Sequence, residues 1–142
     1  MCKIFQMTMC DTQGQLFALA STEGYNSEAF IKTYMTSQIS KDIEKDYNHL
    51  QWAGKAYILS KMEDELGSKL FKDNDTYDSE VLYWIGYIYR YWNYYTGESS
   101  KEIYKQASAK TMKSVYYSYH TMSPQMAIDR LKETYLDKIA KK

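Results

Sequence analysis

The sequence predicts an all-α fold, a single-domain helical bundle of about six helices that covers residues 1–142. Its central feature is the stretch from Val81 to Tyr95, in which only Gly86, Arg90 and Asn93 are neither aliphatic nor aromatic. Strands of globular proteins are usually about 5–6 residues long, so an apolar run of this length favours a buried helix. The chain also contains a single proline, and its 142 residues are enough to bury one core.

The central helix is predicted to span residues 79–95. Asp78 or Ser79 can cap its start, and Thr96-Gly97 provides a C-terminal stop. At about 100° per residue, two faces of this helix are predicted to lie in the core. One face carries Leu82, Ile85, Tyr89 and Trp92, and the other carries Trp84, Ile88, Tyr91 and Tyr95.

A third face carries Tyr83, Tyr87, Arg90 and Tyr94, whose hydroxyls and guanidinium need polar partners or water. Aromatic residues at helical spacing usually belong to the core, which favours rings packed against flanking helices with their hydroxyls at the rim. Alternatively, this face is a recognition surface, because Tyr and Arg dominate binding hot spots. A membrane-spanning helix is excluded, because the run is shorter than about 17 residues and has Arg90 near its middle.

Residues 1–11 are predicted to be an irregular lead-in to the first helix. This helix spans residues 13–22, with Gly24 as its stop. Ser27 is predicted to cap a second helix over residues 28–37.

The polar residues 38–47 are predicted to add one turn, with Ile39 and Ile43 against the core. A long helix over residues 48–66 follows. Gly54 in its interior predicts close helix packing, because glycine there costs up to about 1 kcal/mol relative to alanine. The polar residues 72–76 are predicted to form a loop.

Capping signals predict three further helices. Ser99 and Glu102 form a capping box, Ser108 is a second cap, and Ser123 with Pro124 is a third helix start. The helices are predicted over residues 100–107, 109–119 and 124–139. The last of them is predicted to bury Met126, Ile128, Leu131, Tyr135 and Ile139.

The 18 basic and 18 acidic side chains balance, which does not favour nucleic acid or an anionic membrane as a partner. Cys2 and Cys10 lack metal-ligand spacing, so reduced thiols are expected. The first ten residues have no basic region followed by a long apolar stretch, so we find no signal peptide and predict a cytoplasmic protein.

The sequence contains no HExxH, CxxC, Walker or GxGxxG motif, so we expect no metal, no cofactor and no enzymatic activity. His49 and His120 are predicted to be structural, because the sequence places no nucleophile or orienting carboxylate beside either of them.

Short motifs in the second half are Tyr91-x-x-Tyr94, the run from Gly97 to Tyr104, the run from Tyr116 to Ser123 and Ala127-Ile128-Asp129-x-Leu131. They resemble a family of small bacterial helical proteins catalogued as a domain of unknown function. The resemblance covers about residues 90–131 and departs from the family pattern at Ser100, where glycine is usual. Members are often encoded beside ADP-ribosyltransferase-like toxins, so the resemblance implies an antitoxin-type role.

We therefore expect a non-enzymatic protein that binds a protein partner, such as a toxin encoded nearby. The expected contact residues are Tyr87, Arg90, Tyr94, Ser100, Lys101, Tyr104, His120 and Thr121. Arg90 is expected to be the main anchor of the partner. The alternative is a small-molecule- or nucleotide-binding domain in which Arg90, Lys101 and His120 converge on an anion, and a pocket that joins these three would favour it.

Overall fold

Eight α-helices and one short 3-10 helix make up the part of the chain that the computed structural model describes, residues 3–45 and 53–141. They are α1 (Lys3–Thr22), α2 (Ser27–Met35), α3 (Gln38–Glu44), α4 (Lys55–Leu66), η2 (Gly67–Lys69), α5 (Ser79–Thr96), α6 (Ser100–Gln106), α7 (Ala109–Tyr119) and α8 (Pro124–Ala140). No strand forms in these ranges, so the predicted all-α class is confirmed. The helices in these ranges outnumber the six or so predicted, and the segment expected to add one turn over residues 38–47 forms a capped helix of its own, α3.

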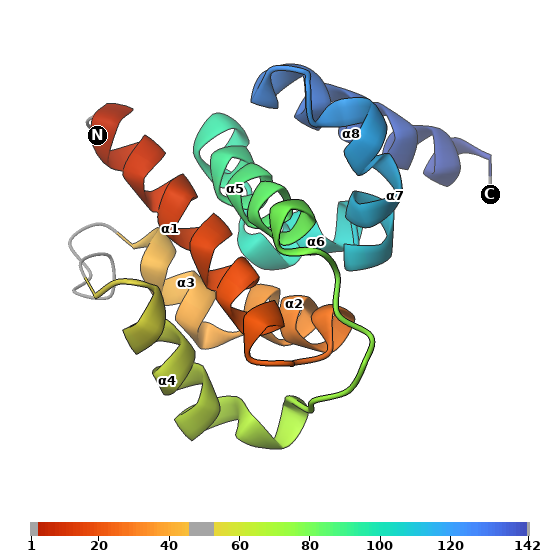
Figure 1. Ribbon diagram of the computed structural model, residues 1–142. Coiled ribbons are helices and arrows are strands. Elements are labelled where there is room, and N and C mark those ends of the chain that lie inside the picture. Colours follow the sequence, from red (N-terminus) through yellow and green to blue (C-terminus); the bar gives the residue numbers. More distant parts are fainter. Residues whose placement is uncertain (1–2, 46–52, 142) are drawn as a thin grey trace.

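Helices α1 and α5 lie side by side at the centre of the bundle (Figure 1). Helices α7 and α8 pack on one side of α5, and α4 packs on the far side of α1. Helix α2 contacts α1, α6 and α7 and closes the bundle from below. The N-terminal segment and the central helix are thus neighbours in space although they are far apart in sequence.

Helix α5 matches the predicted central helix closely. It ends at Gly97, whose φ of 80° is a left-handed conformation that glycine adopts without strain. The first predicted core face is confirmed, because each of its four side chains is at most 1% exposed: Leu82, Ile85, Tyr89 and Trp92. On the second face only Ile88 is buried, whereas Tyr95 is 46% exposed.

The aromatic core is centred on Phe17 of α1. Its ring meets the rings of Phe30, Tyr34 and Tyr89 edge to face, at centroid distances of 5.7, 5.4 and 6.2 Å. Such pairs contribute about 0.5–1.5 kcal/mol each beyond the burial of their area. Phe17 therefore joins α1, α2 and α5 through one side chain.

The predicted irregular lead-in is wrong, because residues 3–11 form the first half of α1. Met9 and Cys10 are buried there, at 2% and 1% exposure. Residues 9, 13, 16, 17 and 20 continue a single buried face of the helix. Packing of this face against α5 stabilises a segment whose own sequence shows no capping signal.

Two local predictions in the first half of the chain are also wrong. The cap of α2 is Asn26, whose side chain accepts from the backbone N–H of Ala29 at 2.9 Å. The Ser27 hydroxyl instead accepts from the backbone N–H of Tyr77 at 2.8 Å. Gly54 lies before α4, at a φ of 82°, and no atom crowds it, so it marks a turn rather than close packing. The earlier part of the predicted helix over 48–66, with His49, lies outside the described residues.

The closest helix packing occurs at Gly14 and Gly86, where α1 meets α5. A Cβ atom added at Gly86 would lie 2.6 Å from the carbonyl oxygen of Gln13. A Cβ added at Gly14 would lie 2.7 Å from the carbonyl oxygen of Tyr83. Both obstacles are backbone atoms, so these positions require glycine for the two helices to approach this closely.

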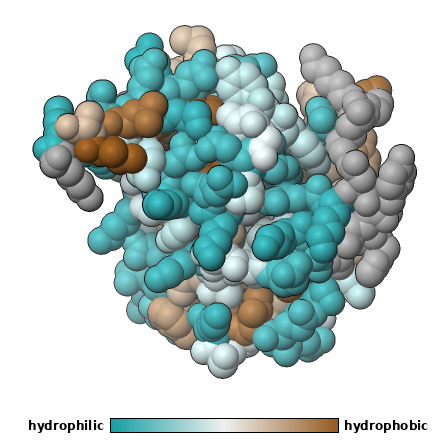
Figure 2. Space-filling view, turned by 180° about the vertical axis from the view of Figure 1, so that it is seen from behind, coloured by the Kyte–Doolittle hydropathy of each residue, from teal (hydrophilic) through white to brown (hydrophobic). Residues whose placement is uncertain are grey.

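The predicted caps Ser99, Ser108 and Ser123 are all confirmed, including the capping box with Glu102. Ile128 and Leu131 of α8 are buried as predicted. Met126 and Ile139, by contrast, are 49% and 48% exposed. Figure 2 shows the molecule from behind, with a mostly hydrophilic face and hydrophobic side chains gathered at the free end of α8. This end extends beyond the helices that cover the first half of α8 (Figure 1).

None of the helices in residues 3–45 and 53–141 combines the length and apolar character that crossing a membrane would require.

We predict that Gly86→Ala lowers the free energy of unfolding by roughly 1–3 kcal/mol, because overpacking against backbone outweighs the higher helix propensity of alanine. Urea unfolding followed by circular dichroism measures the change. Gly67→Ala is the control, because Gly67 has helical backbone angles and nothing within 4 Å of the added Cβ. Equal stability of the two variants would contradict the predicted close approach.

Candidate functional site

Four tyrosines of α5, namely Tyr83, Tyr87, Tyr91 and Tyr95, follow one another at intervals of four residues and form a tyrosine ladder. The ring centroids of successive pairs are 6.1, 6.4 and 6.5 Å apart. Residues i and i+4 are neighbours on a helix surface, so the α5 backbone sets this spacing. The first three side chains are half-buried and Tyr95 is exposed. The ladder therefore presents a row of aromatic rings at the surface.

A groove runs along the tyrosine ladder. It consists of two neighbouring hollows, of about 280 and 520 Å³, that share Tyr87 and Pro124. Helix α5 forms the floor of both hollows. The first half of α1 borders the smaller one, and the junction of α7 with α8 borders the larger one and reaches the smaller one at Pro124. The wall residues are Gln6, Met7 and Cys10 from α1, and Tyr116, His120, Met122 and Pro124 from the junction. We call this surface the tyrosine groove.

Both walls hold the two ends of the ladder in place. The Tyr83 hydroxyl donates to Asp11 of α1 at 2.5 Å, and the Tyr95 hydroxyl donates to Asp129 of α8 at 3.1 Å. Burial and the bond to Asp11 raise the pKa of Tyr83, and the bond to Asp129 raises the pKa of Tyr95. Both phenols therefore stay protonated at neutral pH and can donate these hydrogen bonds.

The middle of the groove contains weakly reactive groups. Burial raises the pKa of the Cys10 thiol to about 12, so it is not a nucleophile at neutral pH. Burial also raises the pKa of Tyr94 to about 12, and its hydroxyl is buried without a hydrogen-bond partner among the described residues. The Tyr91 hydroxyl accepts a hydrogen bond from Gln125 of α8. The groove thus offers aromatic area and neutral polar groups.

His120 lies at the end of α7, on the rim of the larger hollow. Its ring stacks on Tyr116 with centroids 4.5 Å apart, and its Nδ1 lies 2.8 Å from the carbonyl oxygen of Tyr116. A carbonyl oxygen only accepts, so this contact places a proton on Nδ1. His120 therefore ends the helix and shapes the wall, and Thr121 beside it is exposed.

Arg90 is 1% exposed, so its predicted role as the main anchor of a partner does not fit the structure. Its Nε and Nη2 donate to Oε1 of Gln13 at 3.0 and 2.7 Å, and its Nη1 donates to Asn93 at 3.3 Å. The Tyr34 hydroxyl donates to the same Gln13 oxygen at 2.7 Å, and Gln13 donates to the carbonyl of Gly86 at 2.8 Å. Arg90 therefore links α5 to α1 through Gln13 and to α2 through Tyr34.

Three more predicted contact residues lie away from the tyrosine groove. Ser100 is 3% exposed, and its backbone N–H and hydroxyl both donate to the carboxylate of Glu44 on α3. Lys101 is exposed and lines a polar hollow of about 190 Å³ beside α3. Tyr104 lines a separate hollow of about 430 Å³ next to α2 and α7.

The three residues of the anion-binding alternative occupy separate environments. Arg90 is enclosed by α1, α2 and α5, Lys101 faces α3, and His120 faces the tyrosine groove. No single hollow described here joins them. Across the described ranges no group of three or more His, Cys, Asp or Glu side chains is placed to hold a metal ion.

Of the residues that line this groove, Tyr87, Tyr94 and His120 were predicted from the sequence as contact residues. The residues of its α1 wall were not. Gln6, Met7 and Cys10 were assigned to the irregular lead-in. The recurrence of buried residues along α1 was the signal that could have found them. Tyr91 and Tyr95 were assigned to the core, although the four-residue interval of the ladder was visible in the sequence.

No protein-family model, curated protein or solved structure matches the chain. The tyrosine groove is therefore selected as the candidate site on its geometry, because it is concave, mostly apolar and bordered by a few polar groups.

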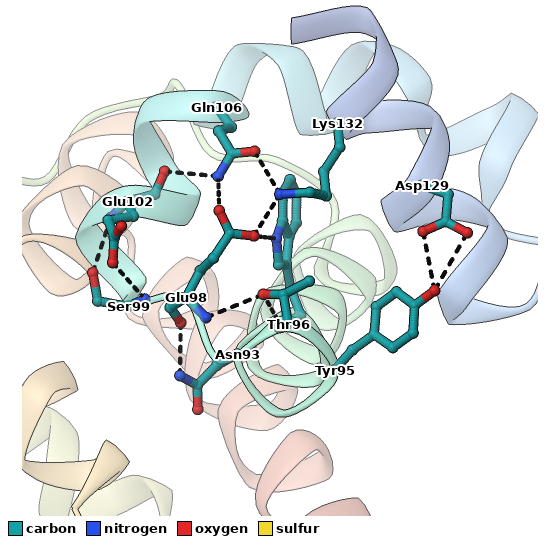
Figure 3. Close-up of polar contacts among 10 residues, drawn as sticks. Asn93, Tyr95, Thr96, Glu98, Ser99, Glu102, Gln106, Asp129 and Lys132 are labelled. Atoms are coloured by element: carbon teal, nitrogen blue, oxygen red, sulfur yellow. Dashed lines mark hydrogen bonds and ion pairs between the residues drawn. The ribbon is translucent and has the colours of Figure 1, made fainter. Parts of the chain in front are cut away.

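A polar network after the end of α5 fixes α8, which carries part of the groove wall (Figure 3). The Glu98 carboxylate accepts from Lys132 Nζ at 2.6 Å, from Trp92 Nε1 at 2.9 Å and from Gln106 Nε2 at 2.5 Å. Partial burial opposes ionisation of Glu98, but these hydrogen bonds outweigh it and lower its pKa to about 2. We call this network the Glu98 clamp. It joins α5, α6 and α8.

We predict that Gln13→Leu destabilises the fold more than Arg90→Met. Gln13→Leu leaves the buried guanidinium of Arg90 poorly paired, which should lower the free energy of unfolding by roughly 3–5 kcal/mol. Arg90→Met removes the buried charge itself, so it should lower the free energy of unfolding by only roughly 1.5–3 kcal/mol, through lost hydrogen bonds. The double variant should cost less than the sum of both. Urea unfolding of the three variants measures their free energies of unfolding. A larger loss of stability for Arg90→Met than for Gln13→Leu would refute the role of Gln13 as the partner that stabilises buried Arg90.

We predict that the Glu98 clamp weakens in acid. The pKa of Glu98 in the folded protein, about 2, lies below the ordinary value of 4.5. The ionised Glu98 therefore contributes its full stabilisation above pH 4.5, and this stabilisation is lost as the pH falls toward 2. Glu98→Gln should therefore lower stability at pH 7 and make the decline between pH 4.5 and 2 shallower. Measuring the free energies of unfolding of the wild type and of Glu98→Gln between pH 7 and pH 2 tests this prediction. Glu133→Gln, at an exposed position of α8, should leave the slope unchanged.

Proposed function

We propose that this protein binds a segment of a protein partner in the tyrosine groove and catalyses no reaction of its own. The observation that carries the proposal is the tyrosine ladder, a row of four rings on α5 with a helical wall on either side. Tyrosine offers a large apolar contact area, a hydroxyl for hydrogen bonds and few torsions to immobilise. These properties enrich it in binding hot spots.

Preorganisation of the ladder supports the proposal. Asp11 and Asp129 hold the hydroxyls of its first and last rings from opposite walls. A surface that is ordered before binding loses less side-chain entropy when a partner arrives. Met7, which lines the smaller hollow, is 49% exposed, so this part of the groove is in contact with solvent.

The side chains of the groove suit contact better than catalysis. Its thiol, Cys10, is protonated at neutral pH, and His120 uses Nδ1 on the backbone of its own helix. Neither has the nucleophile–base pairing that covalent catalysis needs.

The resemblance in the second half supports a more specific role, that of an antitoxin-like or defence-operon component whose partner is a toxin encoded nearby. Residues that carry this resemblance also line the groove: Tyr91, Tyr94, Tyr116, His120 and Met122. Two of the motifs, Tyr91-x-x-Tyr94 and the run from Tyr116 to Ser123, therefore contribute to the groove, whereas the run from Gly97 to Tyr104 lies away from it.

The test is affinity purification of the tagged full-length protein from its source organism. The wild type should retain one stoichiometric protein, and Tyr87→Ala/Tyr91→Ala should bind it roughly 30-fold or more weakly, as expected when hot-spot rings are truncated. Tyr57→Ala is the matched control, because Tyr57 is 51% exposed on α4, away from the groove. Circular dichroism checks that each variant is folded.

Undiminished binding by the double variant would place the site elsewhere. Recovery of a bound nucleotide in place of a protein would favour the small-molecule alternative. A partner that is harmless when expressed alone would remove the antitoxin role and leave the partner-binding function.

A further inference from the structure

We infer that the tyrosine groove selects a positively charged amphipathic helix, one that presents Lys or Arg beside aliphatic side chains. This inference rests on the proposed partner-binding function and adds the chemistry of the partner. It follows from the charges around the groove, from the absence of any Lys or Arg of the described residues over its rings, and from its length.

Three acidic side chains border the groove. The cation of Arg90 lies close to Cys10 and Tyr94 of its lining, but it is 1% exposed and is bound to Gln13. Glu80 lines the larger hollow, and Asp11 and Asp129 bind the hydroxyls of the first and last rings of the ladder. One carboxylate thus comes from each of α1, α5 and α8. No Lys or Arg is among the described residues that line either hollow. A partner with basic side chains would complement this rim and be steered toward it.

No cation of the described residues occupies the ladder, in which Tyr87 and Tyr91 stack on each other with centroids 6.4 Å apart. Elsewhere in this chain Lys72, Lys113 and Lys132 lie over the rings of Tyr25, Tyr77 and Trp92, at 5.2, 4.7 and 5.8 Å from their centroids. Within the described residues, no Lys or Arg lies over a ring of the tyrosine ladder. The negative face of an aromatic ring attracts a cation within about 6 Å, and Arg does so most often.

The length of the ladder fits a short helix. From Tyr83 to Tyr95 it extends about 18 Å along α5, which equals about three turns of a partner helix. Aliphatic side chains on one face of that helix would enter the two hollows, as in other helix-in-groove complexes. Basic side chains on its flanks would then reach the ring faces and the acidic rim. The same rim repels the phosphates of nucleic acids and of anionic lipids.

The experiment uses two 14-residue helical peptides with leucines at the same positions, one with Arg and one with Glu on the flanks. Binding to the full-length protein is measured by calorimetry at low and high salt, and ring signals of the ladder are followed by NMR. The Arg peptide should bind at least about tenfold more tightly than the Glu peptide, with a preference that falls as salt rises.

The decisive variant is Asp11→Asn/Glu80→Gln/Asp129→Asn, which removes three charges and keeps the side-chain shapes and hydrogen-bond acceptors. It should weaken binding of the Arg peptide about tenfold and reduce its salt dependence. The control is Glu23→Gln/Asp64→Asn/Asp137→Asn, which changes the net charge equally at exposed positions outside the groove lining. It should bind like the wild type.

Equal binding of the two peptides, binding of neither, or equal effects of the two triple variants would overturn the inference. So would a dimer of this chain that Tyr87→Ala/Tyr91→Ala dissociates, because a second copy would then cover the groove. The proposed function fails by a different result, namely undiminished capture of the native partner by the Tyr87→Ala/Tyr91→Ala variant. The two failures are therefore distinguishable.

Discussion

The contact between α1 and α5 is the constraint on which the rest of this structure depends. Gly14 and Gly86 let the two backbones approach so closely that a methyl group at either position would meet a carbonyl oxygen. The approach brings Gln13 within reach of Arg90 and Asp11 within reach of Tyr83. It therefore fixes both the buried polar network and one wall of the tyrosine groove.

Two polar networks hold helix α5, one around a buried cation and the other around a partly exposed carboxylate. On the α1 side the cation of Arg90 is fully buried and is bound by the neutral oxygens of Gln13, Asn93 and Tyr34. On the α8 side the carboxylate of Glu98 is partly exposed and pairs with Lys132. Buried charges need hydrogen bonds to offset their lost hydration, and both networks provide them. The face of α5 between them is left for the ladder.

Features decided by a few neighbouring residues could be predicted from the sequence. The bounds of α5, the stop at Gly97 and the caps at Ser99, Ser108 and Ser123 follow from local chemistry, and all are confirmed. The helical start of α1 and the burial of Arg90 depend on partners more than 70 positions away, such as Gln13 on Arg90. No local pattern encodes such a contact, so the pairing of Gln13 with Arg90 was not predicted and Arg90 was taken as the main anchor of the partner.

The position of Trp84 gives the groove an optical reporter of its own. Trp84 lines the larger hollow and meets the ring of Tyr116 edge to face at 5.7 Å. The emission colour of an indole follows the water around it. An occupant that excludes water from this hollow therefore shifts the emission of Trp84 toward the blue, whereas Trp92 in the core has no water to lose. Once Trp52, which lies outside the described residues, is replaced by Phe, the intrinsic fluorescence of the unlabelled protein reports occupancy of the groove.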